Sequence, residues 1–182
     1  MKSAAEIFRS HCIFDAAGRH CNGTDKQSNH AYGDAYDAIF PDRSAVNLLL
    51  EVGVADGSSL LAWQEIFPHA KIVGMDIHVA SKWHGEFHMG DQRSKEDCER
   101  AAAGRQFDAI IEDAVHSLDN TLLTLFYLWP FVKPGGLYIV EEWNNIGACR
   151  GNIAALFPMA EVVDTVGPFG GIEPLVVLRK PL

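Results

Sequence analysis

Basic residues are scarce in this sequence. Its 182 residues include 15 Lys and Arg against 24 Asp and Glu, which gives a formal net charge of −9. This balance disfavours a nucleic-acid partner, because binding to phosphates depends on lysine and arginine side chains. A small neutral or cationic partner suits the charge better.

Long apolar runs and paired cysteines are also missing. No uninterrupted apolar run approaches the roughly 20 residues that span a bilayer. Glu6 and Asp15 interrupt the N-terminal apolar residues, which is unlike a secretory signal. We therefore expect a cytoplasmic protein with no membrane partner. The four cysteines form no C-x-x-C pair, which predicts thiols in a reducing compartment.

A doubled His-Cys dipeptide stands near the N-terminus, and it comprises His11, Cys12, His20 and Cys21. These are zinc-ligand residue types, but their spacing fits no common zinc pattern. The role of this cluster stays open.

Strand-like and helix-like segments alternate along the chain. The patterning predicts helices over residues 3–12, 35–40, 56–67, 94–104, 117–132 and 151–158, and a loop over 18–34. It predicts strands over 46–54, 71–77, 85–91, 107–113 and 134–142, followed by a hairpin of 160–167 and 173–180. This order is typical of an α/β fold with a doubly wound, mostly parallel sheet and an antiparallel C-terminal edge. We expect a single domain over residues 1–182, with an N-terminal cap segment (1–43) and a Rossmann-like core (44–182).

Acidic residues and glycines follow the first three core strands. Glu51, Gly53 and Gly57 lead from the first strand into a helix, and Asp76 and Asp91 end the next two. Glycines there let the backbone approach a ligand, and a carboxylate after the second strand can accept hydrogen bonds from ribose hydroxyls. Each acid alone is more often a solvated strand end. Their repetition favours a nucleotide-like ligand, although the G-x-G-x-x-G pattern of dinucleotide-binding proteins is absent.

A second group of acids follows the two next strands. Asp113 ends the fourth core strand, and Glu141 and Glu142 end the fifth. Three carboxylates at one sheet edge suit Mg²⁺, with Mn²⁺ and Ca²⁺ as alternatives. His116 lies three positions after Asp113 and has the ordinary pKa of a general base. The competing interpretation of His116 is a polar residue at a helix start.

Several motifs together resemble a known family. They are "GTDK" followed by "H-x-Y" and "Y-x-x-x-F", then "EVGVADGSSLLAW", "GMDI", "GDQ", "FDAIIED-x-x-H" and "PGGLYIVEE". Nearly the whole chain resembles the class I S-adenosylmethionine-dependent methyltransferases, and these motifs resemble the metal-dependent macrocin and mycinamicin sugar O-methyltransferases. The resemblance implies a seven-stranded sheet of order 3-2-1-4-5-7-6. It also implies an S-adenosylmethionine pocket lined by Glu51, Gly53, Gly57, Ser59, Asp76, Asp91 and Gln92, with Thr24 and Lys26 near the cofactor or the cleft entrance.

The implied activity is Mg²⁺-dependent methylation of a hydroxyl on a sugar or glycosylated natural product. Asp113, Glu141 and Glu142 would hold the metal, and His116 would be the base. The family commonly has a second aspartate where Glu112 stands and an aspartate where Glu142 stands. A homo-oligomer that completes the acceptor pocket is compatible with the resemblance.

Three alternatives remain at this stage. A catechol-type methyltransferase would keep the carboxylates but carry a lysine in place of His116. A non-catalytic S-adenosylmethionine-binding domain would need none of the residues proposed for catalysis. A hydroxylase, a label given to some relatives, would need a 2-His-1-carboxylate iron pattern that the sequence does not show.

Overall fold

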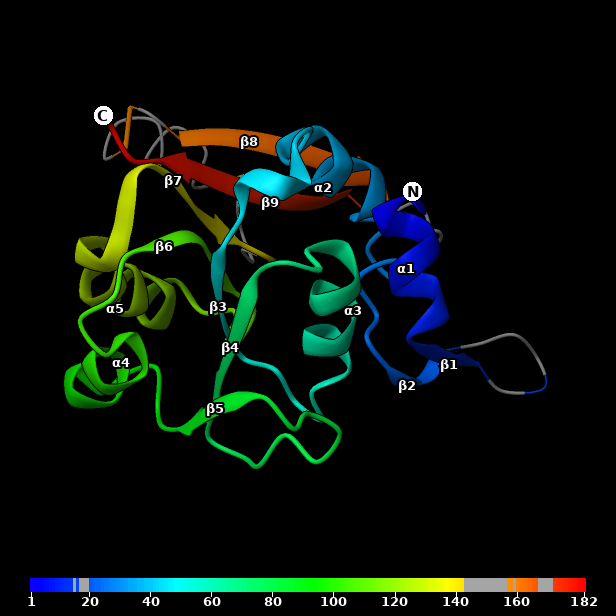
Figure 1. Cartoon of the computed structure of the whole chain (residues 1–182), viewed down its shortest axis with the longest axis horizontal. Coiled ribbons are helices and arrows are strands. Elements are labelled where there is room, and N and C mark those ends of the chain that lie inside the picture. Colours follow the sequence, from blue (N-terminus) through cyan, green and yellow to red (C-terminus); the bar gives the residue numbers. More distant parts are fainter. Residues whose placement is uncertain (15, 17–19, 143–156, 159, 167–171) are drawn as a thin grey trace.

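The architecture is a seven-stranded sheet with helices on both faces, beside a separate two-stranded ribbon (Figure 1). The computed structural model describes residues 1–14, 16, 20–142, 157–158, 160–166 and 172–182. The helix predicted over 151–158 lies almost wholly outside the described residues. None of the described helices is both long and apolar enough to cross a membrane.

The main sheet contains seven strands. In chain order they are β3 (Leu48–Val52), β4 (Lys71–Asp76), β5 (Glu86–Met89), β6 (Phe107–Glu112), β7 (Val132–Val140), β8 (Ala160–Val166) and β9 (Ile172–Arg179). Their spatial order is β5-β4-β3-β6-β7-β9-β8. The first five strands pair in parallel, and β9 pairs antiparallel with both β7 and β8. This confirms the predicted order 3-2-1-4-5-7-6 and the antiparallel C-terminal hairpin.

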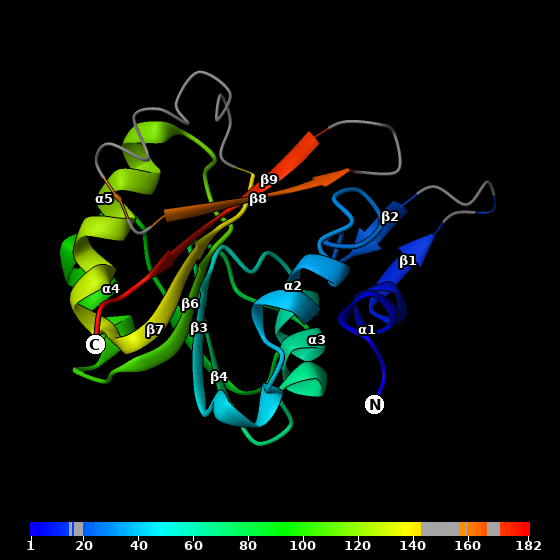
Figure 2. The same ribbon diagram turned by 90° about the horizontal axis from the view of Figure 1, so that it is seen from above.

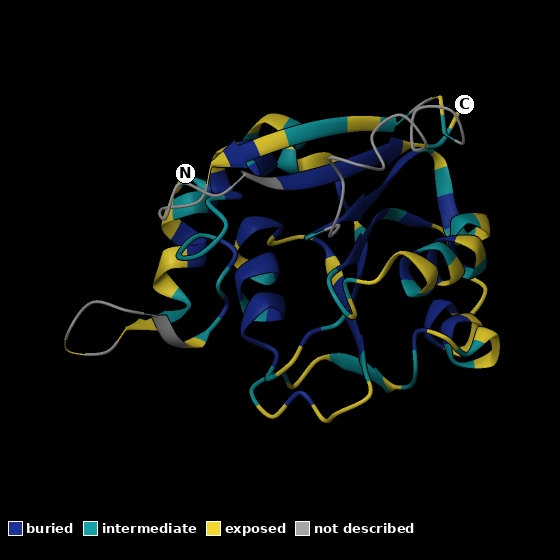
Figure 3. Ribbon diagram, turned by 180° about the vertical axis from the view of Figure 1, so that it is seen from behind, coloured by how far each residue is buried: buried dark blue, intermediate teal, exposed yellow. Residues whose placement is uncertain are grey.

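Helices cover the two sheet faces in separate groups. The helices α1 (Ala4–Ser10), α2 (Gly33–Ile39) and α3 (Ser58–Ile66) pack on one face, and α4 (Lys95–Ala102) and α5 (Leu118–Leu128) on the other. The central strands β3, β4, β6 and β7 are mostly apolar because both of their faces are covered, and the buried residues in Figure 3 follow the sheet between the helices. Short 3₁₀ turns span Arg43–Ala45 and Trp129–Phe131.

The helix predicted over 117–132 ends earlier than expected. Helix α5 stops at Leu128, and Pro130 lies in the 3₁₀ turn that follows. Proline cannot donate the main-chain hydrogen bond that a continuing helix needs. The chain then enters β7 at Val132.

The N-terminal segment contains more structure than the sequence predicted. The predicted loop over 18–34 includes β2 (His20–Gly23), which pairs antiparallel with β1 (Cys12–Phe14). These strands are short, with three and four residues, and they form a small ribbon beside α1 (Figure 2). Neither strand has an alternating apolar pattern, so their pairing left no signal in the sequence.

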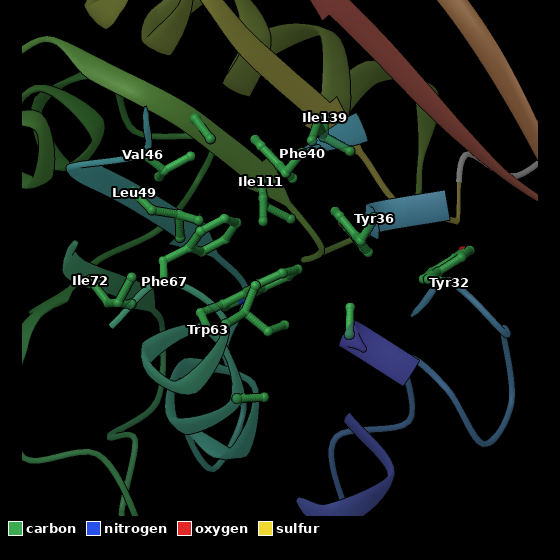
Figure 4. Close-up of a cluster of buried hydrophobic side chains, with 14 of the residues drawn as sticks. Tyr32, Tyr36, Phe40, Val46, Leu49, Trp63, Phe67, Ile72, Ile111 and Ile139 are labelled. Atoms are coloured by element: carbon green, nitrogen blue, oxygen red, sulfur yellow. The ribbon is translucent and has the colours of Figure 1, made fainter. Parts of the chain in front are cut away.

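The N-terminal segment is packed into the core. Phe8 and Tyr36 meet Trp63 of α3 edge-on, with ring centroids 4.9 and 4.8 Å apart. All three side chains are buried, and Figure 4 shows Tyr36 between Tyr32 and Trp63 in the same cluster. The segment predicted as a cap therefore shares the core of the sheet.

A charged cluster on β5 predicts a pH-dependent contribution to stability. Arg105 donates two hydrogen bonds to Glu86, at 3.1 and 2.6 Å, and these hold the pKa of Glu86 well below its usual value of 4.5. A lowered folded-state pKa stabilises the protein above the unfolded pKa, and this stabilisation is lost as the pH falls. Glu86→Gln should lower the free energy of unfolding by about 1 kcal/mol at pH 7. The difference from wild type should shrink below about pH 4.5 in denaturant titrations; an equal difference at all pH values would contradict the assignment.

Candidate active site

A cavity of about 460 Å³ opens at the carboxyl ends of β3, β4, β5 and β6. This is the edge where doubly wound sheets bind ligands, and the volume is within the usual range for small-molecule sites. Of the predicted cofactor residues, those that line it are Gly53, Ser59, Asp76, Asp91 and Gln92. Thr24, which the sequence placed only loosely near the cofactor, also lines it.

The cavity wall is acidic. Its carboxylates come from Asp25, Asp56, Asp76, Asp91 and Asp113, whereas its one permanently cationic side chain among the described residues is Arg93. Arg93 already makes hydrogen bonds of 2.6 to 3.1 Å to the carboxylate of Asp91. Such a wall favours a ligand that carries positive charge.

The loop between β3 and α3 depends on glycines. Gly53 has a φ of +86°, and a Cβ there would lie 2.2 Å from the main-chain oxygen of Asp113. Gly57 has a φ of +89° and begins α3 against Trp83. Only glycine adopts such angles without strain. Gly53 borders the cavity, whereas Gly57 is not among its lining residues.

Asp76 fastens this loop to the end of β4. Its Oδ2 accepts hydrogen bonds from the main-chain N–H groups of Val54 and Ala55, at 2.8 and 2.9 Å, and its Oδ1 accepts one from His78. Each carboxylate oxygen has more than one acceptor site. The side chain can therefore hold the loop and still accept from a ligand in the cavity.

Gln92 links the cavity to the next loop. Its amide nitrogen donates to Glu112 and Thr124, at 3.0 and 2.9 Å, and its Oε1 accepts from the N–H of Val115 at 2.8 Å. Burial raises the pKa of Glu112 to about 7. The amide of Gln92 thus holds the segment that carries Asp113 and His116.

Glu51 lies beneath the cavity and is fully buried. It accepts a hydrogen bond of 2.6 Å from Ser59 and lies 3.1 Å from the ammonium group of Lys26. It does not line the cavity wall, so the cofactor contact that the resemblance implied for Glu51 stays a prediction.

The sequence analysis placed Lys26 only loosely, near the cofactor or the cleft entrance. Its ammonium group is 1% exposed and lies 2.6 Å from both Asp113 and Glu141. Burial alone would lower the pKa of Lys26, but the charges of Asp113, Glu141 and Glu51 raise it well above its usual value. The "GTDK" motif was the only signal for this residue, and it did not indicate partners far along the chain.

Glu141 faces Lys26 and the hydroxyl group of Tyr36, which donates a short hydrogen bond to it. Burial raises the pKa of Glu141 and of Glu51 despite the nearby ammonium group. Lys26 thus supplies one positive charge to three carboxylates, those of Glu51, Asp113 and Glu141. This excess of negative charge favours binding of an added cation.

Within the described residues, the one group of side chains placed to share a metal ion comprises Asp113, His116 and Glu142. One ligand atom from each lies within 4.8 Å of the others. Carboxylate oxygens suit Mg²⁺ or Mn²⁺, whereas an imidazole nitrogen is more typical of transition-metal ions. Asp113 and Glu142 were predicted as ligands, and His116 joins them in this group. Glu141 is outside it, so its role as a ligand stays a prediction.

Glu142 lies between two histidines. Its Oε2 is 2.7 Å from Nε2 of His116 and its Oε1 is 2.7 Å from Nε2 of His30. Hydrogen bonds from His116 and then His30 hold the pKa of Glu142 well below its usual range. Burial opposes protonation of both imidazoles, yet their carboxylate partners raise the pKa of His116 and raise that of His30 to about 10.

Of the doubled His-Cys dipeptide, only His11 and Cys12 have described side chains. The ring of His11 lies 3.2 Å from Glu65 of α3, and the side chains of His20 and Cys21 lie outside the described residues. Trp143, Asn144 and Asn145, which follow Glu142 in the sequence, are also outside them.

Three curated relatives are similar to this chain over about two thirds of its length. Mycinamicin VI 2''-O-methyltransferase of Micromonospora griseorubida is 33% identical over 136 residues, covering 65% of this chain and 34% of the relative. Demethylmacrocin O-methyltransferase of Streptomyces fradiae is 32% identical over 140 residues, covering 66% and 35%. The 8-demethyl-8-alpha-L-rhamnosyl tetracenomycin-C 2'-O-methyltransferase of Streptomyces olivaceus is 32% identical over 136 residues, covering 66% and 35%. The matches thus span about one third of these relatives' length, and no family model matches the chain.

Solved structures show the same fold. The MycE methyltransferase of the mycinamycin biosynthetic pathway, in complex with Mg and SAH, superposes with a TM-score of 0.72 at 22% identity, over 99% of this chain and 55% of that one. A putative ribosomal RNA methyltransferase from Plasmodium falciparum has a TM-score of 0.65 at 17% identity, over 82% and 94%. The chain therefore has the Rossmann-like fold of the class I S-adenosylmethionine-dependent methyltransferases and, in sequence, resembles the mycinamicin and macrocin sugar O-methyltransferases.

Proposed function

We propose that this chain transfers a methyl group from S-adenosylmethionine to a hydroxyl group of a sugar or glycosylated natural product, with a divalent cation such as Mg²⁺. One observation carries the proposal: Asp113 both lines the acidic cavity and belongs to the group of Asp113, His116 and Glu142. A methyl donor in the cavity and an acceptor at that group would meet at Asp113.

The cavity suits the proposed methyl donor. S-adenosylmethionine carries a sulfonium and an ammonium charge, which the surrounding carboxylates would stabilise. Asp76 would accept hydrogen bonds from ribose hydroxyls, a role that its position at the end of the second parallel strand favours. Asp91 and Gln92 would border the adenine ring of the cofactor.

The carboxylates and histidine fit a bound cation. Asp113 and Glu142 would hold it, with His116 or Glu141 completing the set. Such a cation would lower the pKa of an aliphatic hydroxyl, which is otherwise too weak an acid to react. The transfer forms the bond between the acceptor oxygen and the methyl carbon and breaks the methyl–sulfur bond.

His116 is the proposed base of this reaction. It lies at the cavity end of the loop that follows β6, and its ring is a quarter exposed, so an acceptor can approach it. In its neutral form the imidazole would take the hydroxyl proton as the oxygen attacks the methyl group. Asp113 and Glu142, at 3.9 and 2.7 Å from Nε2, would stabilise the imidazolium that results.

Titration calorimetry with S-adenosylmethionine tests the proposal most directly. Wild type should bind, and Asp76→Ala should bind about 10- to 100-fold more weakly because the ribose would lose charge-assisted hydrogen bonds. Glu161→Ala, a change on the distant strand β8, is the matched control and should bind as wild type. Failure of wild type to bind would overturn the whole proposal.

A methyl-transfer screen then separates enzyme from binding domain and one acceptor from another. Sugar diols, nucleosides and catechols should be offered with Mg²⁺ and again with EDTA. We expect turnover of a sugar diol that EDTA abolishes. Binding without any turnover would favour the non-catalytic domain, and turnover of catechols alone would identify the aromatic acceptor class.

A further inference from the structure

The carboxylate of Glu142 is held from outside the sheet by His30. His30 lies in the loop between β2 and α2, and its Nε2 is 2.7 Å from Oε1 of Glu142. His116 contacts the other oxygen, Oε2, at the same distance. With an imidazole at each oxygen, the carboxylate is fixed in position and in rotation.

The main chain of Glu142 has an unfavourable conformation. Its φ is +47°, in the left-handed region that a residue with a side chain rarely adopts. Such a conformation persists where the surroundings hold it in place. Tyr32 contributes to this, because its hydroxyl group accepts a hydrogen bond of 3.3 Å from the N–H of Glu142.

His30 is itself held on several sides. Its ring stacks on Tyr32, with centroids 5.1 Å apart and planes 19° apart. Nε2 lies 3.3 Å from Oδ2 of Asp25, and the main-chain oxygen of His30 accepts a hydrogen bond of 2.8 Å from Thr165 of β8. The side chain is 12% exposed. His30 therefore has a fixed position, from which its hydrogen bond holds the Glu142 carboxylate.

We infer that His30 is a positioning residue which orients the Glu142 carboxylate and thereby sets the affinity of this chain for a divalent cation. The inference rests on the proposed function, since it takes Glu142 to be a ligand. His30 holds the oxygen of Glu142 that faces away from His116, so it acts through Glu142. Hydrogen-bonded partners of metal ligands have this effect because they lock the ligand in its binding orientation.

The test measures Mn²⁺ binding to the intact chain by electron paramagnetic resonance, with no substrate present. His30→Leu should weaken Mn²⁺ binding by about 10- to 100-fold. His30→Gln should restore most of the affinity, because the glutamine amide also donates a hydrogen bond to a carboxylate. S-adenosylmethionine affinity should change little in both variants. His69→Leu, which replaces an exposed histidine on another loop, is the matched control and should bind Mn²⁺ as wild type does.

The outcomes separate the inference from the function beneath it. If wild type binds Mn²⁺ and His30→Leu binds it equally well, the inference is wrong and the metal site stands. If wild type binds no Mn²⁺, the proposed metal is wrong, and the positioning role fails with it. Should His30→Leu fail to fold, His30→Asn keeps a polar side chain that is too short to hold Oε1 of Glu142 as the imidazole does. It should weaken Mn²⁺ binding in the same direction, and unchanged binding in a folded His30→Asn would overturn the inference.

Discussion

Replacing His116 by alanine is expected to slow methyl transfer by about 10²- to 10⁴-fold, the usual contribution of a positioned general base. The expected loss is in kcat, because the imidazole would act on the acceptor proton during the reaction. Binding of S-adenosylmethionine should persist, since His116 is not among the residues that line the cavity. Single-turnover transfer to the best acceptor of the screen, measured beside calorimetry, checks both expectations.

A second variant, His116→Gln, distinguishes a base from a metal ligand. The glutamine amide can still donate a hydrogen bond to Oε2 of Glu142 but cannot act as the base. If His116 acts as the base, His116→Gln should lose the rate and keep most of its Mn²⁺ affinity; a loss of both would make the imidazole a ligand, together with Asp113 and Glu142. His69→Ala is the matched control, because this histidine is exposed and far from the cavity. An unchanged rate in His116→Ala would leave His116 with a structural role only.

Replacing Lys26 by methionine should destabilise the fold by about 3–5 kcal/mol. Methionine preserves the length and apolar packing of the side chain but removes the ammonium group at 2.6 Å from Asp113 and Glu141 and 3.1 Å from Glu51. Glu51 and Glu141 are fully buried, and removal of one partner leaves such charges uncompensated. Thermal unfolding should show a Tm lower by roughly 10 °C.

The loss of stability in Lys26→Met should depend on pH. Without Lys26, burial would raise the pKa of Glu51 and Glu141 still further above the usual value of 4.5. A carboxyl group whose pKa is raised in the folded state destabilises the folded protein as the pH rises above the unfolded-state pKa. The difference between wild type and Lys26→Met should therefore be largest near pH 7 and shrink toward about pH 4.5.

Lys95→Met is the matched control for this lysine. The side chain of Lys95 is 59% exposed and lies 3.6 Å from Glu99 on the surface of α4. Loss of an exposed pair of this kind should change the free energy of unfolding by less than about 0.5 kcal/mol. Equal effects of the two substitutions would contradict the ion-pair cluster around Lys26.

The fold of the core was readable from local patterns. Strands such as β3 and β6 are mostly apolar, and helices such as α3 begin after glycine and polar residues. These features belong to neighbouring residues, so they are visible without the tertiary structure. The same holds for the acids that end parallel strands, because parallel pairing brings successive strand ends to one edge.

The sequence by itself thus determined the seven-stranded sheet, the cavity edge and the identity of several polar residues along it. The tertiary structure decided which residues at this edge the N-terminal segment contacts. It placed Lys26 against Asp113 and Glu141, which lie 87 and 115 positions further along the chain. It also placed His30 against Glu142, and it turned Glu141 toward Lys26 and Tyr36. These contacts join residues that no local pattern relates, because they depend on how the first segment packs against the sheet edge and not on the spacing of residues within any one element.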